Sequence, residues 1–127
     1  MAFKLAVIHR DPAGAVFAAA YGEATARDFP AQNHILFDTL LGDGWSSLRV
    51  ALDLDAVPYV DSSAIGWLIH AQKMFRDNGG RLVLHSVQPH VKNILNLLKI
   101  EKVVPIVSDL EEAQKSLQDK TRRKQTV

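Results

Sequence analysis

Residues 48–66 read LRVALDLDAVPYVDSSAIG, and they hold the clearest structural patterns in the chain. Its first part, from Leu48 to Leu54, alternates large apolar side chains with arginine, alanine and aspartate, a period of two that predicts a strand. Its last part opens a second pattern, in which apolar side chains recur at the helical period from Ser62 to Asn78. The stretch therefore predicts a β-strand that runs directly into an amphipathic helix.

Similar signals extend the pattern towards both ends of the chain. Two short apolar runs separated by turn-forming residues predict a starting β-hairpin, and strand and helix patterns alternate after it. A hairpin followed by such alternation predicts one α/β domain with a mixed, mostly parallel sheet and helices mainly on one face. The expected strands cover residues 3–9, 15–21, 48–54, 81–86 and 103–107, and the expected helices cover 28–41 and 62–78 and begin at Pro89 and after Asp109.

Length and composition agree with a single folded unit. The chain has 127 residues, of which 47% are hydrophobic and 23% charged, as in an average globular domain. We expect a domain over residues 1–118 and a basic, flexible tail over residues 119–127. The absence of cysteine excludes thiol catalysis, thiolate metal sites and disulfides.

The charge distribution bears on partners and location. Residues 120–127 hold four basic side chains and no acid, so the remainder carries 11 basic and 14 acidic residues, a net charge of −3. A weakly acidic body lacks the basic face that a nucleic-acid partner requires. No apolar run has the length of a membrane span or a signal peptide. These features predict a soluble cytoplasmic protein that neither binds nucleic acid nor inserts into a membrane.

Motifs for catalysis are missing. The five histidines form no recognised zinc spacing, and neither a phosphate-binding glycine loop nor a Gly-x-Ser-x-Gly elbow occurs. Asp53, Asp55 and Asp61 lie close in sequence and could in principle act as an acid–base pair or hold Mg²⁺, but solvated acids at a strand end explain them better. We therefore expect no enzyme, no metal and no cofactor.

The junction between strand and helix is the exception. Asp61 and Ser62 are both favourable N-cap residues, and the simplest interpretation is that they only cap the helix. A phosphate on a hydroxyl at this position would add a charge of about −1.5 to −2 at a helix N-terminus, which tolerates an anion. The same charge beside Asp61 would repel an acidic partner. The junction is thus suited to a switch that changes a surface without unfolding the domain.

A family resemblance rests on these residues together. The starting hairpin, Asp61-Ser62-Ser63-x-Ile-Gly after a strand, Gly-Gly-Arg-Leu-Val-Leu at 79–84 and Val-x-x-Ile-Leu-x-Leu-Leu at 91–98 resemble the STAS domain, and more narrowly the bacterial anti-sigma factor antagonists. The resemblance implies a non-catalytic protein that binds an anti-sigma factor with serine kinase activity. It also implies that this kinase phosphorylates Ser62 and that a serine phosphatase reverses the modification.

The same resemblance implies roles for neighbouring residues. Ser63 is expected to support the cap, and Ala64 stands where the family usually has glycine, so that its methyl group would hinder the approach of a partner. Thr25 stands where the family often has an aspartate beside the phosphoserine. Trp67 has two interpretations: it packs at the edge of the core, or it is exposed beside Ser62 and anchors a partner.

The alternative for the whole protein is a constitutive STAS scaffold subunit of a stress-signalling assembly or a membrane-transport complex.

Overall fold

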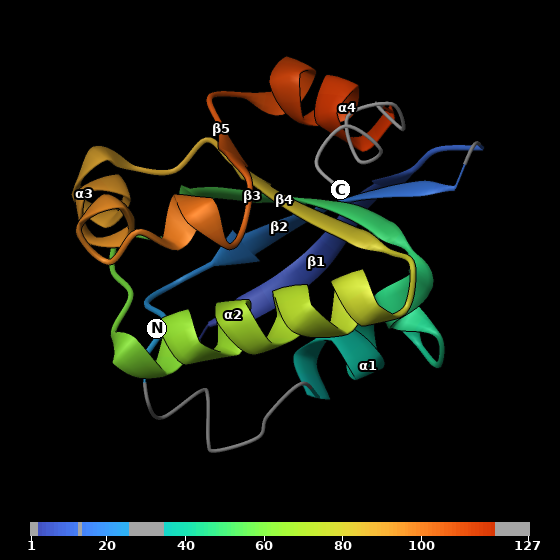
Figure 1. The fold of residues 1–127 in the computed structure, drawn as a ribbon, viewed down its shortest axis with the longest axis horizontal. Helices are drawn as coiled ribbons and strands as arrows, with labels where there is room; N and C mark the ends of the chain where they lie inside the picture. The colour runs from blue at the N-terminus through green and yellow to red at the C-terminus, as the bar shows by residue number, and fades with distance from the viewer. Residues whose placement is uncertain (1–2, 13, 26–34, 119–127) are drawn as a thin grey trace.

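The computed structural model describes residues 3–12, 14–25 and 35–118, which form a five-stranded sheet with helices on both faces (Figure 1). The strands lie in the order β1-β2-β3-β4-β5. β1 and β2 form the antiparallel hairpin, and every later pair is parallel. The mixed, mostly parallel sheet is therefore confirmed, with β1 at Lys4–Arg10, β2 at Ala15–Tyr21, β3 at Arg49–Ala56, β4 at Arg81–His85 and β5 at Ile106–Val107.

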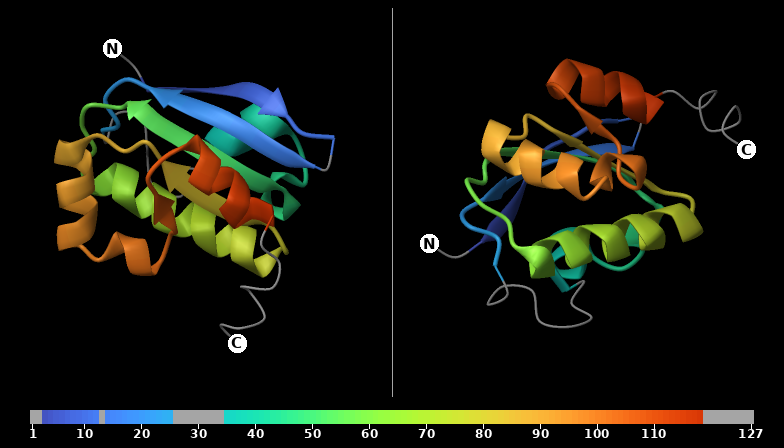
Figure 2. Two further views of the ribbon diagram at one scale, coloured as in Figure 1. Left: turned by 90° about the horizontal axis from the view of Figure 1, so that it is seen from above. Right: turned by 60° about the vertical axis from the view of Figure 1, so that its left-hand side comes forward.

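More helices pack on one face of the sheet than on the other. Figure 1 and the right-hand view of Figure 2 show α1 and α2 beneath the sheet and α4 above it. The buried side chains of α3 also belong to the same core as those of α2. Helices thus cover mainly one face, as expected, and α4 is the exception. Their bounds are Ile35–Leu41 for α1, Ser62–Asp77 for α2, Pro89–Leu97 for α3 and Leu110–Gln118 for α4, with 3₁₀ turns at Trp45–Ser47 and Ile100–Lys102.

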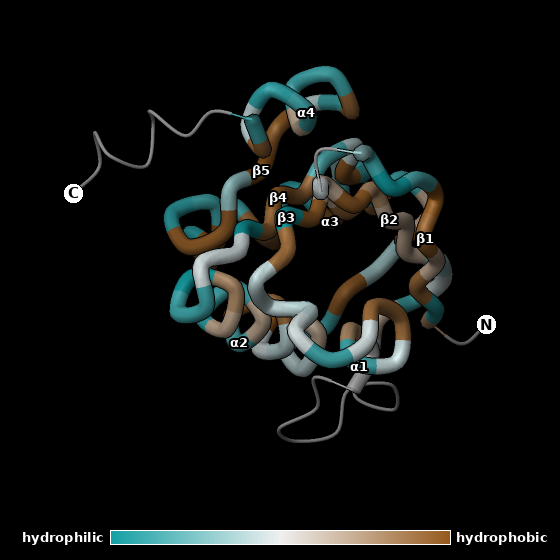
Figure 3. The backbone as a smooth tube through the Cα atoms, turned by 90° about the vertical axis from the view of Figure 1, so that its right-hand side faces the viewer, coloured by the Kyte–Doolittle hydropathy of each residue, from teal (hydrophilic) through white to brown (hydrophobic). Residues whose placement is uncertain are grey.

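Alternation along β3 separates two cores. Val50, Leu52 and Leu54 point into the larger core between the sheet and α1, α2 and α3. Ala51 packs into a smaller core under α4, and Asp53 follows it on that face. The tube in Figure 3 shows hydrophobic residues in the central strands and hydrophilic ones along much of α4.

An aromatic cluster joins α1, the 3₁₀ turn at Trp45–Ser47 and α2. The Phe37 ring is fully buried and stacks on Trp45 and Trp67, with centroid distances of 5.2 and 5.1 Å. Phe75 contacts Phe37 and Trp45 edge-on. Because offset and edge-on pairs add to the energy of burial, this cluster holds α1 and α2 together.

One predicted strand has the wrong bounds, and one predicted core residue is exposed. The strand expected over residues 103–107 is reduced to Ile106–Val107, since a 3₁₀ turn at Ile100–Lys102 occupies the chain just before it. The spacing of Val91, Ile94, Leu95 and Leu98 predicts one apolar stripe along α3, but Leu98 is 55% exposed, because the helix ends at Leu97 and Lys99 turns the chain away with a φ of 58°. The expected start of the first helix at residue 28 and the tail over residues 119–127 lie outside the described residues.

Candidate functional site at the amino end of α2

Asp61 begins α2 as its N-cap. Its backbone is extended, and its Oδ1 accepts hydrogen bonds from the backbone N–H groups of Ser63 and Ala64, at 2.9 and 3.1 Å. These are two of the donors that the first turn of a helix leaves without a partner. Of the two capping residues that the sequence offers, the structure uses Asp61, and Ser62 becomes the first residue of the helix.

Ser62 is consequently left at the surface. Its side chain is exposed, and among the described residues its hydroxyl makes no hydrogen bond. Ser63, the next residue, is half-buried and gives its N–H to the cap. An exposed hydroxyl in the first turn of a helix is accessible to a modifying enzyme, and its modification would break no hydrogen bond of the fold.

A second segment lies beside this helix start. Ala24 forms a parallel bridge with Val60: its N–H donates to the carbonyl of Tyr59 at 2.9 Å, and its own carbonyl accepts from the N–H of Asp61 at 3.0 Å. Thr25 follows Ala24 directly, so the fold brings a second, half-buried hydroxyl residue next to the Asp61 cap. The expected proximity of Thr25 to Ser62 therefore has a backbone cause.

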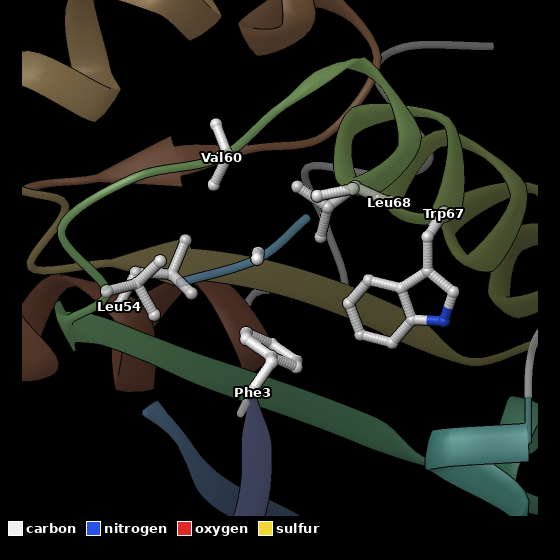
Figure 4. A pocket seen from close by; sticks show the side chains of 8 residues that line it. Phe3, Leu54, Val60, Trp67 and Leu68 are labelled. Carbon is white, nitrogen blue, oxygen red and sulfur yellow. The ribbon is translucent and has the colours of Figure 1, made fainter. Parts of the chain in front are cut away.

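Ala64 and Trp67 lie beneath the surface rather than on it. Ala64 is 2% exposed and Trp67 is 5% exposed, and both side chains face the core (Figure 4). The gap that they line with Phe3, Leu54, Val60 and Leu68 has a volume of about 10 Å³, too little for a ligand. Of the two interpretations of Trp67, packing is the one that fits, and the Ala64 methyl group does not stand in the way of a partner.

An exposed aromatic pair near the site was not anticipated. Tyr59 is 41% exposed in the loop before α2, and its ring stacks on His90 of α3 with a centroid distance of 6.4 Å. The nearby amide of Gln88 donates to the carbonyl of Asp55, which ties the start of α3 to the end of β3. A tyrosine between turn residues carries no periodic signal, so only the fold reveals this pair.

The three aspartates do not form one site. Asp53 faces the α4 side of the sheet, where its Oδ1 accepts the backbone N–H of Asp55 at 2.8 Å, whereas Asp61 caps α2. Within residues 3–12, 14–25 and 35–118, no group of three or more His, Asp or Glu side chains is placed to hold a metal ion. No helix in that part of the chain is long and apolar enough to cross a membrane.

Comparison with known families identifies the fold. The sequence model of the STAS domain matches residues 20–113, which include the end of β2, the whole candidate site and the start of α4. The chain therefore belongs to the STAS domain family.

Two curated relatives narrow the resemblance. A protein of Thermotoga maritima named "Putative anti-sigma factor antagonist" is 27% identical over 85 residues, which cover 67% of this chain and 74% of that protein. The protein BtrV of Bordetella bronchiseptica, with the same description, is 29% identical over 65 residues, 51% of this chain and 56% of the relative. The match thus spans little more than half the length of the second relative.

Solved structures support the fold. A crystal structure described as that of a "putative anti-sigma factor antagonist" from Thermotoga maritima superposes on this chain with a TM-score of 0.70 at 24% identity. The match covers 82% of this chain and 87% of that one. The Bacillus cell fate determinant SpoIIAA, solved in its phosphorylated form, gives a TM-score of 0.61 at 17% identity and covers 91% and 97% of the two chains. At these identities the likeness concerns the fold.

Proposed function

We propose that this protein is an anti-sigma factor antagonist, a cytoplasmic, non-catalytic binding module that is switched by phosphorylation of Ser62. Its partner would be an anti-sigma factor with serine kinase activity, and a serine phosphatase would restore the binding form. The observation that carries the proposal is the exposed Ser62 hydroxyl beside the Asp61 cap, in a chain of the STAS family. The description of SpoIIAA as a protein with a phosphorylated form supports the same class of regulation.

The physical basis of the switch is charge at a fixed surface. Phosphorylation adds about −1.5 to −2 charges at the first turn of α2, where free N–H groups and the helix dipole favour an anion. The fold would therefore keep its stability. A partner that desolvates this surface would face the phosphate together with the Asp61 carboxylate, and binding would weaken.

The proposed contact surface consists of Asp61, Ser62, Ser63 and Thr25. Ala64 and Trp67 support this surface from below, since both are buried. We propose no cofactor, no metal and no nucleic acid as a ligand. A constitutive scaffold role would use the same surface without the switch.

A capture experiment with charge variants tests the proposal. The full chain, Ser62→Ala, Ser62→Asp and Ser108→Asp are used as baits in lysate of the native organism, and captured proteins are identified by mass spectrometry. Ser108 is exposed next to Asp109, ahead of α4, so Ser108→Asp adds the same charge away from the candidate site. The captured kinase is then incubated with ATP and the unmodified chain, and the phosphorylated residue is mapped.

The proposal expects a particular pattern of capture. An ATPase of the serine-kinase class should bind the unmodified chain, Ser62→Ala and Ser108→Asp but not Ser62→Asp, and phosphate should appear on Ser62. Equal capture of the same partners by all four baits would instead indicate a constitutive scaffold. Phosphate on another residue would remove Ser62 from the switch.

A further inference from the structure

A pocket of about 260 Å³ lies on the opposite face of the sheet from Ser62. Its floor is formed by side chains of β1, β2, β3 and β4 that point towards the α4 side, and its rim includes Leu110 at the start of α4. The pocket exists because α4 packs on β3 and β4 and leaves the neighbouring part of β1 and β2 uncovered. Its volume is close to the lower end of the range for small-molecule sites.

Polar groups converge in this pocket. Asp53 and His85 are direct partners in the parallel register of β3 and β4, so their side chains lie next to each other on the same face. His85 is only 3% exposed, and its Nδ1 lies 2.8 Å from the hydroxyl of Ser86, which also lines the pocket. Ser86 has a left-handed backbone, with a φ of 59°, a conformation that is uncommon for residues other than glycine.

The Asp53 carboxylate has spare capacity for a ligand. One oxygen, Oδ1, accepts the backbone N–H of Asp55, and in the described part of the chain the other accepts no hydrogen bond. Among the residues that the structure describes, no lysine or arginine lines the pocket. Burial lowers the pKa of His85, while the Asp53 and Asp109 carboxylates act in the opposite direction, so its imidazole is neutral at pH 7. The pocket therefore carries negative charge.

An aromatic wall lies beside this charge. The His9 and Phe17 rings stack with a centroid distance of 6.0 Å and an interplanar angle of 26°, and both line the pocket. Leu110 and Ile8, which are 46% and 61% exposed, extend the apolar rim. A carboxylate next to aromatic rings is the combination that recognises a cation joined to an apolar body.

We propose that this pocket binds a small organic cation, an ammonium or guanidinium group on a short aromatic or apolar body, with Asp53 as its counter-ion. The neutral imidazole of His85 and the Ser86 hydroxyl offer further hydrogen bonds to the same group, and the His9 and Phe17 rings contact the body. This inference goes beyond the proposed function and is independent of it, because the pocket and Ser62 lie on different faces.

Two matched probes test the sign of the charge. The isotope-labelled full chain is titrated with phenethylamine and with phenylacetate, which share a ring and differ in charge, and backbone and histidine resonances are followed by NMR. We expect saturable shifts with millimolar phenethylamine at residues lining the pocket, and at least tenfold weaker binding of phenylacetate. N-acetyl-arginine amide is added as a third probe, since tighter binding of that compound would point to a protein side chain as the natural source of the cation.

Two aspartate variants locate the counter-ion. Asp53→Asn keeps an oxygen to accept the Asp55 N–H but removes the charge, and it should weaken phenethylamine binding by about tenfold or more, as expected for a charge-assisted hydrogen bond. Asp55→Asn changes an exposed neighbour that does not line the pocket, and it should leave the affinity within about twofold. Equal binding of phenylacetate, equal loss in both variants, or no saturable shift in this pocket would overturn the proposal.

Discussion

The N-cap of α2 offers a prediction whose size follows from the structure. Asp61 accepts two backbone N–H groups through one oxygen, so replacing it by alanine removes the acceptor of both hydrogen bonds and the charge at the helix N-terminus. Loss of an N-cap costs about 0.5–2 kcal/mol, and loss of the charge–dipole interaction costs about 0.3–1 kcal/mol. We therefore expect Asp61→Ala to lower the free energy of unfolding by about 1–2 kcal/mol. Asp61→Asn and Asp61→Ser keep an acceptor and should lose about 0.3–1 kcal/mol, the charge contribution alone.

Urea unfolding followed by tryptophan fluorescence measures these differences. Both tryptophans, Trp45 and Trp67, are buried in the aromatic cluster, so their emission reports on loss of the core. The expected order of stability places the unmodified chain first, Asp61→Asn and Asp61→Ser next and Asp61→Ala last. If Asp61→Ala were as stable as the unmodified chain, water would satisfy the first turn equally well. If all three variants lost the same amount, the cap would not be the reason.

The same variants separate folding from recognition. Asp61→Asn retains the cap but not the charge. A partner that contacts the Asp61 carboxylate should therefore bind this variant less well, while the stability of the variant changes little. Parallel loss of stability and binding would instead attribute the effect of Asp61 to the helix alone.

Four further predictions concern the rest of the molecule. Ser62→Asp should change the free energy of unfolding by less than about 0.5 kcal/mol in urea unfolding, since Ser62 is exposed and not the cap. Phe37→Ala should cost about 3–5 kcal/mol in the same assay, because the ring is fully buried. Burial depresses the pKa of His85 below its usual 6.5, so the unfolded chain takes up a proton at this residue before the folded chain does. The free energy of unfolding should therefore fall as the pH drops below 6.5. His85→Gln should make this free energy less dependent on pH in unfolding curves measured at a series of pH values. Gly80→Ala should lower the free energy of unfolding by about 1–3 kcal/mol, because its methyl group would meet two carbonyl oxygens just before β3. Gly66→Ala should raise the melting temperature, because Gly66 lies within α2 with open space around it and alanine favours a helix.

Local patterns explain why much of the site was predictable. Three local signals act through backbone groups nearby in sequence: the alternation along β3, the capping residues before α2 and the glycines after α2. The structure confirms the strand, the helix and the start of the helix at Ser62. Which of two adjacent capping residues is used was not predictable, since Asp61 and Ser62 are both suitable by type. The Asp61 side chain takes the role because its own backbone is extended.

The α/β class, the hairpin, the order of the elements and the Asp-Ser-Ser junction could be predicted from local patterns, since each depends on residues a few positions apart. The residues that lie beside that junction and beneath it are known only from the three-dimensional fold. The bridge between Ala24 and Val60 places Thr25 at the helix start, and packing against Phe3 and Phe37 takes Trp67 out of reach of a partner. The pairing of Asp53 with His85 likewise depends on the register of two strands. Such contacts join residues far apart in the chain, and their geometry is fixed by sheet register and core packing, which no local pattern encodes.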